Sequence, residues 1–166
     1  MEIITNSELD ILCQDVVTNA VAYDIPLHPI LQLLYNTGLR IEEAIQAERW
    51  SAIDADGYNV VLAKSSGVRY IHRYLVPEKC QDIYDDPLVN FFQFRIRQVR
   101  YYIKYYTPAT NISKGMKDSV CHLFRYNYCR KLYDEGYTIE EISEIIKHST
   151  PALTSHYVFD PIINNN

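Results

Sequence analysis

The chain of 166 residues lacks any apolar run approaching the ~20 residues that a membrane-spanning helix needs. Its first residues, MEIITNSELD, also lack the basic segment followed by an apolar stretch that marks a secretory signal. We therefore expect a cytoplasmic protein with no membrane partner.

Closely spaced cysteine pairs are missing too. The four cysteines, at positions 13, 80, 121 and 129, form no C-x-x-C pair and show no zinc-site spacing. We expect reduced thiols and no metal site. Glycine and proline are sparse, with 5 and 7 residues, while 48% of the chain is hydrophobic and 22% is charged. This composition is typical of a soluble globular protein, and the length predicts a single domain over residues 1–166.

The chain has no excess of basic over acidic residues, because its net charge is −5. That value argues against a protein whose whole surface binds nucleic acid, but it allows one basic face. Residues 91–106, FFQFRIRQVRYYIKYY, carry basic side chains, several tyrosines and no acid. The run could contact nucleic acid, or it could be an amphipathic helix with an aromatic core face and a solvated basic face.

The hydrophobic pattern predicts a mainly α-helical α+β fold with one small antiparallel sheet. Apolar residues at helical spacing indicate helices, which we place at 5–22, 27–37, from 39–41 onward, 87–104, 117–135, from 138 and from 151. Gly38 is expected to end the second helix, and Thr138 with Glu141 forms a capping box. β-Branched and aromatic residues around the turn KSSG indicate a hairpin within 57–77, with Lys64 at its turn. Residues 111–119 read as a loop and the tail 160–166 as frayed.

The segment HLFR places His122 and Arg125 three residues apart, so on a helix both project from one face. Taken alone, such a pair is usually a solvated polar stripe. A functional interpretation needs support from other parts of the chain.

That support comes from four segments in a fixed order: LLYNTGLRIEEAI (33–45), LAKSSGVR (62–69), HLFR (122–125) and IIKHSTPALTSHYV (145–158). Together they resemble the catalytic domain of the tyrosine recombinases, the phage-integrase family. The family pattern is T-G-L-R-x-x-E, a hairpin lysine, H-x-x-R, and a later histidine followed nine residues on by tyrosine. The matching positions are Arg40 with Glu43, Lys64, His122, Arg125, His148 and Tyr157.

The resemblance implies that Tyr157 attacks a DNA phosphodiester and forms a 3′-phosphotyrosine, with neither a metal nor another cofactor. Arg40 and Arg125 would bind the non-bridging oxygens, because planar, permanently charged guanidinium groups match the charge of a phosphoryl transition state. Lys64 would protonate the leaving 5′-oxygen. The ordinary pKa of tyrosine is near 10, so we expect the surrounding cations to favour the phenolate of Tyr157.

Supporting roles follow from the same resemblance. His122 would transfer a proton near the nucleophile, and His148 would hydrogen-bond a non-bridging oxygen. Glu43 would brace Arg40. Two further basic residues, Arg69 and Lys147, are candidate DNA contacts. The chain departs from the family at Lys147, where an L-G-H glycine is usual, and after Arg125, where Tyr126 replaces a frequent histidine.

The implied partner is double-stranded DNA, bound by a homotetramer when the protein is full length and only weakly by an isolated, monomeric domain of this charge. The implied location is the nucleoid of a cell that hosts a phage or mobile element. Family members carry a separate N-terminal core-binding domain, which we expect to be absent from this chain.

Two alternatives remain at this point: a degenerate relative that only binds DNA or regulates a recombinase, and a type IB topoisomerase-like enzyme. Every catalytic residue type is present, which favours an active recombinase. His148 and the compact spacing point away from the topoisomerases.

Overall fold

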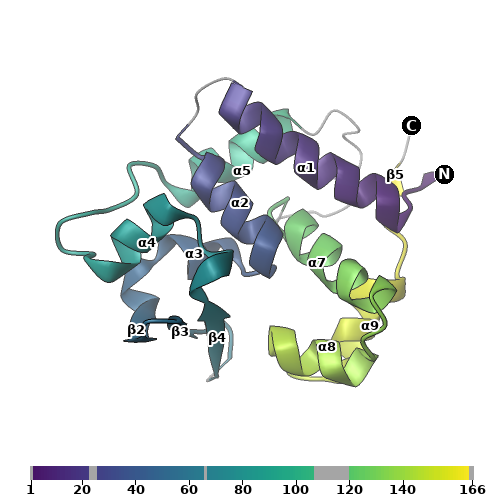
Figure 1. Cartoon of the computed structure of the whole chain (residues 1–166). Helices are drawn as coiled ribbons and strands as arrows, with labels where there is room; N and C mark the ends of the chain where they lie inside the picture. The colour runs from purple at the N-terminus through teal and green to yellow at the C-terminus, as the bar shows by residue number, and fades with distance from the viewer. Residues whose placement is uncertain (1, 23–25, 66, 107–119, 165–166) are drawn as a thin grey trace.

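The computed structural model describes residues 2–22, 26–65, 67–106 and 120–164. As predicted, this part of the chain is mainly helical with a small antiparallel sheet (Figure 1). Helix α7 (His122–Asp134) packs against α1 (Asn6–Ala22) and α2 (His28–Thr37) on one side, and against α8 (Ile139–Ile146) and α9 (Pro151–Phe159) on the other. The helix that carries His122 and Arg125 is therefore central to the fold.

The main sheet has three strands in the order β2 (Trp50–Asp54), β3 (Gly57–Val61) and β4 (Val68–His72). The predicted hairpin is confirmed: Val61 pairs with Val68, and Lys64 lies in the connection between them. Strand β2 was not predicted. It is short and mostly exposed, and the Oδ1 atom of Asp54 closes its turn into β3 by accepting the backbone N–H groups of residues 56 and 57.

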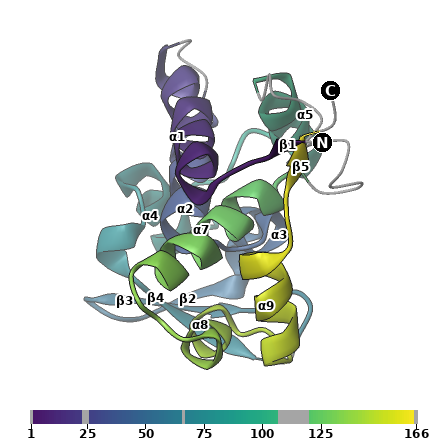
Figure 2. The same cartoon turned by 90° about the vertical axis from the view of Figure 1, so that its right-hand side faces the viewer.

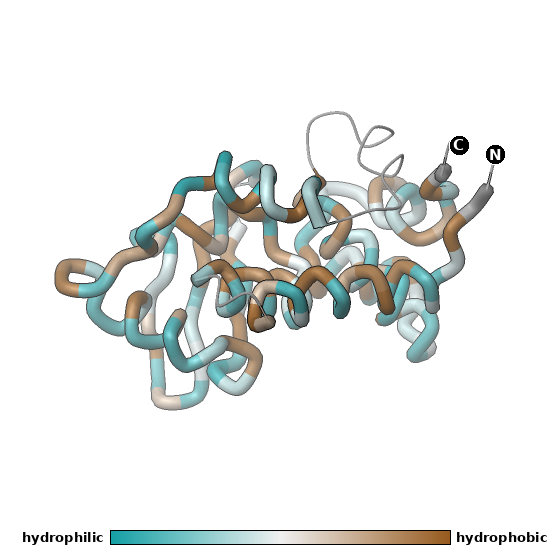
Figure 3. The backbone as a smooth tube through the Cα atoms, turned by 90° about the horizontal axis from the view of Figure 1, so that it is seen from above, coloured by the Kyte–Doolittle hydropathy of each residue, from teal (hydrophilic) through white to brown (hydrophobic). Residues whose placement is uncertain are grey.

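Two hydrophobic clusters lie on the two sides of α7. The larger one joins α1, α2, α3 (Ile41–Ile45), the sheet, α4 (Glu78–Asp85) and α5 (Ile96–Tyr105). Apolar and polar segments alternate along the helices, as expected where one face of each is buried (Figure 3). The smaller cluster joins α7, α8 and α9, and its buried members are Cys129, Ile142, Ile146, Tyr157 and Val158. Tyr157 is thus held in a small apolar layer beside α7.

The predicted helix over 87–104 is wrong in its first half, because α5 begins only at Ile96. In the preceding segment, Phe92 and Phe94 pack on the core while Phe91 is 68% exposed. This alternation has a period of two, which a helix cannot satisfy. Helix α4 was not predicted either, although buried Cys80 and Tyr84 share the four-residue spacing of one helix face.

The predicted helix ends near the site are confirmed. Gly38 ends α2 with a φ of 65°, and Thr138 with Glu141 caps α8 through reciprocal hydrogen bonds. Pro151 opens α9, where the Thr150 hydroxyl accepts the backbone N–H of residue 153. The loop predicted at 111–119 and the start of the helix predicted from 117 lie outside the described residues.

The tail was expected to fray, and this is wrong for residues 162–164. Strand β5 (Ile163–Asn164) pairs with β1 (Glu2–Ile3), so the two ends of the chain lie side by side (Figure 2). Ile162 is 5% exposed and belongs to the main core. Burial of this side chain holds the tail in place. The polar composition of residues 164–166 gave no sign of this contact.

Two short 3-10 helices, η1 (Ala47–Arg49) and η2 (Arg73–Leu75), flank the sheet. Within the described ranges, no helix has both the length and the apolar character to cross a membrane. The four cysteines are buried and free.

Candidate active site

The phenol of Tyr157 is the centre of the candidate site. Its hydroxyl lies 2.9 Å from Nδ1 of His122, so α9 and α7 meet at this pair. The ring of His148 lies 4.8 Å from the Tyr157 ring, and Cζ of Arg125 lies 5.9 Å from it. Tyr157 and three other residues that the sequence motif singled out are therefore brought together around one phenol.

Arg125 connects three separate segments of the chain. It is 1% exposed, and its guanidinium donates to the carbonyl of Gly38 at 2.8 Å and to the carbonyl of Ile146 at 3.3 Å. Gly38 precedes α3, and Ile146 ends α8. A side chain at Gly38 would be strained by the positive φ and would meet the ring of Tyr128 at 2.7 Å. Glycine there lets α7 approach the turn whose carbonyl holds Arg125.

Arg40 immediately precedes α3, and Glu43 fixes its position. The carboxylate of Glu43 is fully buried, and it accepts the backbone N–H of Arg40 at 2.9 Å and that of Ala63 at 3.1 Å. Its Oε2 atom also lies 3.6 Å from Nη1 of Arg40. Glu43 thereby ties the start of α3 to the residue next to Lys64, which is itself exposed on the connection between β3 and β4.

His148 follows the end of α8 and is oriented by α9. Its Nδ1 lies 2.7 Å from the hydroxyl of Thr154, and the side chain is 9% exposed. Lys147, just before it, adopts the left-handed conformation with φ of 59° and ends α8. The backbone N–H groups of both residues donate to the Ser143 carbonyl. Lys147 thus occupies a conformation that glycine adopts more readily, which explains the glycine usual in the family.

Positive charge dominates the electrostatics of the site. Burial, followed by the charges of Arg125 and Arg40, lowers the pKa of His122 to about 4. The same causes lower the pKa of His148 to about 3. Both imidazoles are therefore neutral at pH 7. A neutral His122 can accept the hydroxyl proton of Tyr157 through Nδ1.

The surrounding cations favour the phenolate of Tyr157, as expected, but burial outweighs their effect. Burial is the largest influence and raises the pKa of the phenol above its ordinary value, although Arg125 and Arg40 act in the opposite direction. Tyr157 is 7% exposed, so loss of water outweighs the two cations. The hydroxyl therefore stays protonated and needs a base when it reacts.

Several buried nitrogen atoms of the site have no hydrogen-bond partner in the described part of the chain. They are Nε of Arg40, Nε of Arg125 and Nε2 of His148. Buried polar groups are almost always hydrogen-bonded, so each exception needs an explanation. An anion among these groups would satisfy them and would balance their charge.

Arg69, a candidate DNA contact, is 4% exposed and lies with Cζ 5.4 Å from the centre of the Tyr128 ring. Direct contact with DNA therefore stays a prediction, which this burial does not favour. Its charge instead helps to lower the pKa of His148. Alternation along β4 could have placed Arg69 inside, since Ile71 lies on the same face.

Arg100 is a residue that sequence analysis did not assign to the site. It lies on α5, donates to Glu42 at 3.2 Å, and its charge contributes to the low pKa of His122. No sequence signal could have found it, because its partner on α3 is 58 residues away. Arg100 therefore extends the positive region from α7 to α5.

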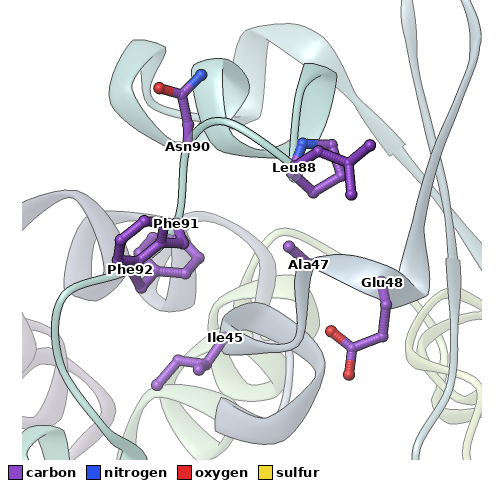
Figure 4. A pocket seen from close by; sticks show the side chains of 8 residues that line it. Ile45, Ala47, Glu48, Leu88, Asn90, Phe91 and Phe92 are labelled. Carbon is purple, nitrogen blue, oxygen red and sulfur yellow. The ribbon is translucent and has the colours of Figure 1, made fainter.

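A small-molecule site or a metal site would require other features of the structure. A pocket of about 360 Å³ opens between η1 and the segment before α5, where Ile45, Leu88 and Phe92 line it (Figure 4). None of the predicted site residues lines that pocket. In the portion of the chain that the structure describes, no three His, Cys, Asp or Glu side chains are grouped to hold a metal ion.

Replacing Lys147 by glycine is expected to raise the free energy of unfolding by about 0.5–1 kcal/mol, because glycine removes the strain of the positive φ. The ion pair that this change deletes, to Glu144 at 3.6 Å, is exposed and contributes little. Urea unfolding measures the effect. If Lys147 contacts DNA, the same variant binds DNA more weakly despite being more stable, and a loss of stability would contradict the strain argument.

The arrangement of most of the chain is similar to that of solved recombinases. The crystal structure of XerA recombinase matches with a TM-score of 0.61 and 17% identity, over 95% of this chain and 58% of that chain. XerH site-specific recombinase bound to its difH substrate matches with a TM-score of 0.59 and 13% identity in a pre-cleavage complex, over 93% of this chain and 49% of that chain. The post-cleavage complex on palindromic difH matches with 0.60 and 14%, over 93% and 48%.

These likenesses show that the chain has the fold of a tyrosine recombinase catalytic domain. The chain spans only about half the length of the recombinases that it matches. No protein-family model and no curated protein matches the sequence.

Proposed function

We propose that this chain is the catalytic domain of a site-specific tyrosine recombinase, which cleaves and rejoins double-stranded DNA through a 3′-phosphotyrosine. One observation carries the proposal: Tyr157 lies with its hydroxyl 2.9 Å from a neutral His122, beside the buried Arg125 and the partly buried Arg40. A nucleophile, a base and paired guanidinium groups are what attack on a phosphodiester requires. The fold shared with XerA and XerH supports this interpretation.

In the proposed first step, the Tyr157 oxygen bonds to the phosphorus of the scissile phosphate and gives its proton to Nδ1 of His122. The bond between phosphorus and the 5′-oxygen breaks. Arg40 and Arg125 would donate hydrogen bonds to the non-bridging oxygens. Nε2 of His148 would do the same in the tautomer whose Nδ1 accepts from the Thr154 hydroxyl, and these bonds would satisfy the buried nitrogen atoms that have no protein partner. Each such donor typically contributes about 3–4 kcal/mol to stabilising the transition state.

The leaving 5′-oxygen takes its proton from Lys64. The hairpin places this lysine at the edge of the positive region, close enough for its charge to lower the pKa of His122. Glu43 holds the preceding residue, so the hairpin and Arg40 are positioned together. Because the phosphotyrosine keeps the energy of the broken bond, a 5′-hydroxyl from another strand can displace Tyr157 in the reverse reaction without ATP.

The partner we propose is duplex DNA, since the XerH structures are described as complexes with a difH substrate. We further propose that full-length protein assembles as a tetramer on DNA, in the cytoplasm of a cell hosting a phage or mobile element. An isolated domain with a net charge of −5 is expected to bind weakly at physiological salt, because phosphate contacts depend steeply on ionic strength.

Covalent trapping tests the proposal. Nicked, end-labelled duplexes tiled from DNA flanking the gene are incubated with the protein at low salt, and adducts are read on a denaturing gel. We expect a labelled adduct with the wild-type chain and none with Tyr157→Phe. Tyr137→Phe is a matched control, because this exposed tyrosine lies outside the site and its removal should leave the adduct unchanged.

The outcomes separate the alternatives. DNA binding without an adduct from the wild-type chain would indicate a DNA-binding relative and overturn the proposed chemistry. An adduct in the Tyr157→Phe variant would assign the nucleophile to another residue. Relaxation of supercoiled plasmid without exchange of strands between duplexes would indicate a topoisomerase.

A further inference from the structure

Three hydrogen-bonded polar side chains form a chain beside Tyr157. The Tyr126 hydroxyl lies 3.0 Å from Nε2 of His156, and Nδ1 of His156 is hydrogen-bonded to the carboxylate of Asp160. Tyr126 lies on α7, whereas His156 is on α9 and Asp160 ends that helix. None of these three residues has a role in the proposed reaction, yet together they join the two helices that meet at the nucleophile.

Tyr126 also packs directly on the nucleophile. The centres of the Tyr126 and Tyr157 rings lie 4.4 Å apart, with an angle of 34° between their planes. His122 and Tyr126 are four residues apart and share one face of α7. One of them contacts the hydroxyl of Tyr157 and the other contacts its ring. Together they set both the position and the tilt of the phenol.

The hydrogen-bond chain has a single direction when the imidazole of His156 is uncharged. A carboxylate can only accept, so Nδ1 of His156 carries a proton and donates it to Asp160. In a neutral imidazole, Nε2 then accepts from the Tyr126 hydroxyl. Burial, with the charge of Asp160, raises the pKa of Tyr126 to about 12, so this hydroxyl keeps its proton.

The last turn of α9 is held at the same place by a buried arginine. Arg130 is 4% exposed, and it donates to the carbonyl of Tyr157 at 3.3 Å and to the carbonyl of Asp160 at 2.6 Å. Arg130 therefore fixes the backbone of α9. The ring of Tyr157 can still rotate about its side-chain bonds, and the contact with Tyr126 restricts that rotation.

We propose that Tyr126 is a positioning residue for the nucleophile, oriented by His156 and Asp160. The chain holds the Tyr126 ring against Tyr157, so that the Tyr157 hydroxyl stays directed at His122. This inference rests on the proposed function of Tyr157 as the nucleophile. It also gives a physical role to Tyr126, which stands where the family frequently has histidine.

Tyr126→Phe tests the role of the hydroxyl while keeping the ring. We expect the rate of adduct formation at saturating duplex to fall about 10- to 100-fold, because small displacements of a reacting group cost rates of this size. The dissociation constant for DNA should stay within about twofold, since the proposal gives Tyr126 no contact with the substrate. A merely structural role would instead lower the melting temperature and weaken DNA binding together.

A matched control lies on the same helix. Tyr133 is also on α7, is 40% exposed, and packs edge-on against Phe159 of α9 at 5.1 Å. Tyr133→Phe removes the same atom from the same helix pair and should not change the rate. An equal loss in this control would show that packing of α7 on α9 is generally sensitive, which would overturn the specific role of Tyr126.

A double variant tests whether the chain acts as a unit. Asp160→Asn weakens the hydrogen bond between His156 and residue 160, at the end of the chain that is farthest from Tyr126, and should slow adduct formation as well. The combined Tyr126→Phe, Asp160→Asn variant should be no slower than Tyr126→Phe alone, because groups that act through one another are not additive. Independent, multiplying losses would contradict the chain.

Nitration tests the positioning without DNA. Trypsin cuts after Lys147 and releases residues 148–166, HSTPALTSHYVFDPIINNN, in which Tyr157 is the sole tyrosine. The folded protein is treated with tetranitromethane before digestion, and nitration of Tyr157 is read in this peptide. We expect Tyr157 to be nitrated several-fold faster in Tyr126→Phe than in the wild-type chain or in Tyr133→Phe. Equal nitration in all three would overturn the positioning role. If the wild-type chain forms no adduct with any duplex, the proposed function fails, and nitration still decides the inference.

Discussion

Replacing Arg125 by lysine is expected to slow DNA cleavage by about 10²–10³-fold and to lower the free energy of unfolding by about 2–4 kcal/mol. The first effect follows from the proposed transition state, where a fork of two N–H groups meets two phosphate oxygens. Lysine keeps the charge but offers a single point of donation. Adduct formation at saturating duplex measures the rate, and urea unfolding measures the stability.

The second effect arises because Arg125 supports the fold in addition to the site. It donates to the carbonyls of Gly38 and Ile146, which belong to segments 108 residues apart in the chain, and a single ammonium cannot reach both. The lost bond leaves a buried carbonyl without a partner. Movement at Gly38 displaces Arg40, and movement at Ile146 displaces His148. Damage from this one change therefore reaches other residues of the candidate site.

A stability-matched control separates the two effects. Leu9→Ala, on α1, is expected to cost about 2–5 kcal/mol because Leu9 is fully buried in the main core. At a temperature where both variants are folded, Leu9→Ala should cleave at the wild-type rate. If it loses as much activity as Arg125→Lys, reduced stability explains both, and the proposed role of the guanidinium is wrong.

The order of the motif segments predicted much of the candidate site, and local signals predicted several of the elements that carry it. Gly38 and the capping box at Thr138 fixed two helix ends next to the site, and the turn after Val61 fixed the hairpin that carries Lys64. Each of these signals is local. The spacing between His122 and Arg125 is also a local signal, since two residues that are three positions apart on a helix lie on the same face.

Interactions between distant segments could not be predicted in this way. The bond from Arg125 to Gly38 and the ion pair of Arg100 with Glu42 depend on how α7 and α5 pack against α3. The protonated state of Tyr157 is a similar case. Nearby cations could be predicted from the motif, but the burial that outweighs them is a property of the folded layer between α7, α8 and α9.

Lowering the pH from 7 to 5 is expected to remove about 2 kcal/mol of stability through each of two histidines, His122 and His148. The unfolded chain takes up protons on both as the pH falls below about 6.5. The folded protein does not, because burial and the charges of Arg125 and Arg40 hold the pKa values near 4 and 3. This stability is complete above pH 6.5 and is lost as the pH falls toward those values.

Urea unfolding at pH 7 and pH 5 measures the loss. Carboxylates such as Asp85, whose pKa is lowered from 3.8 mainly by Arg73, lose their contribution only at lower pH. The variants His122→Gln and His148→Asn should each reduce the pH-dependent loss by about 2 kcal/mol. His72→Gln removes an exposed histidine of β4 and sets the baseline. Equal losses in all variants would show that the site histidines are not held neutral.

Bound duplex should weaken this acid sensitivity. A phosphate between Arg40 and Arg125 adds negative charge where the positive charges now repel a proton, so the pKa of His122 and of His148 must rise. The stability lost between pH 7 and pH 5 then becomes smaller with saturating DNA than without it, and by linkage DNA binds more tightly at pH 5. Binding that weakens as the pH falls would mean that the phosphate lies elsewhere, because a phosphate at this position is coupled to both imidazoles.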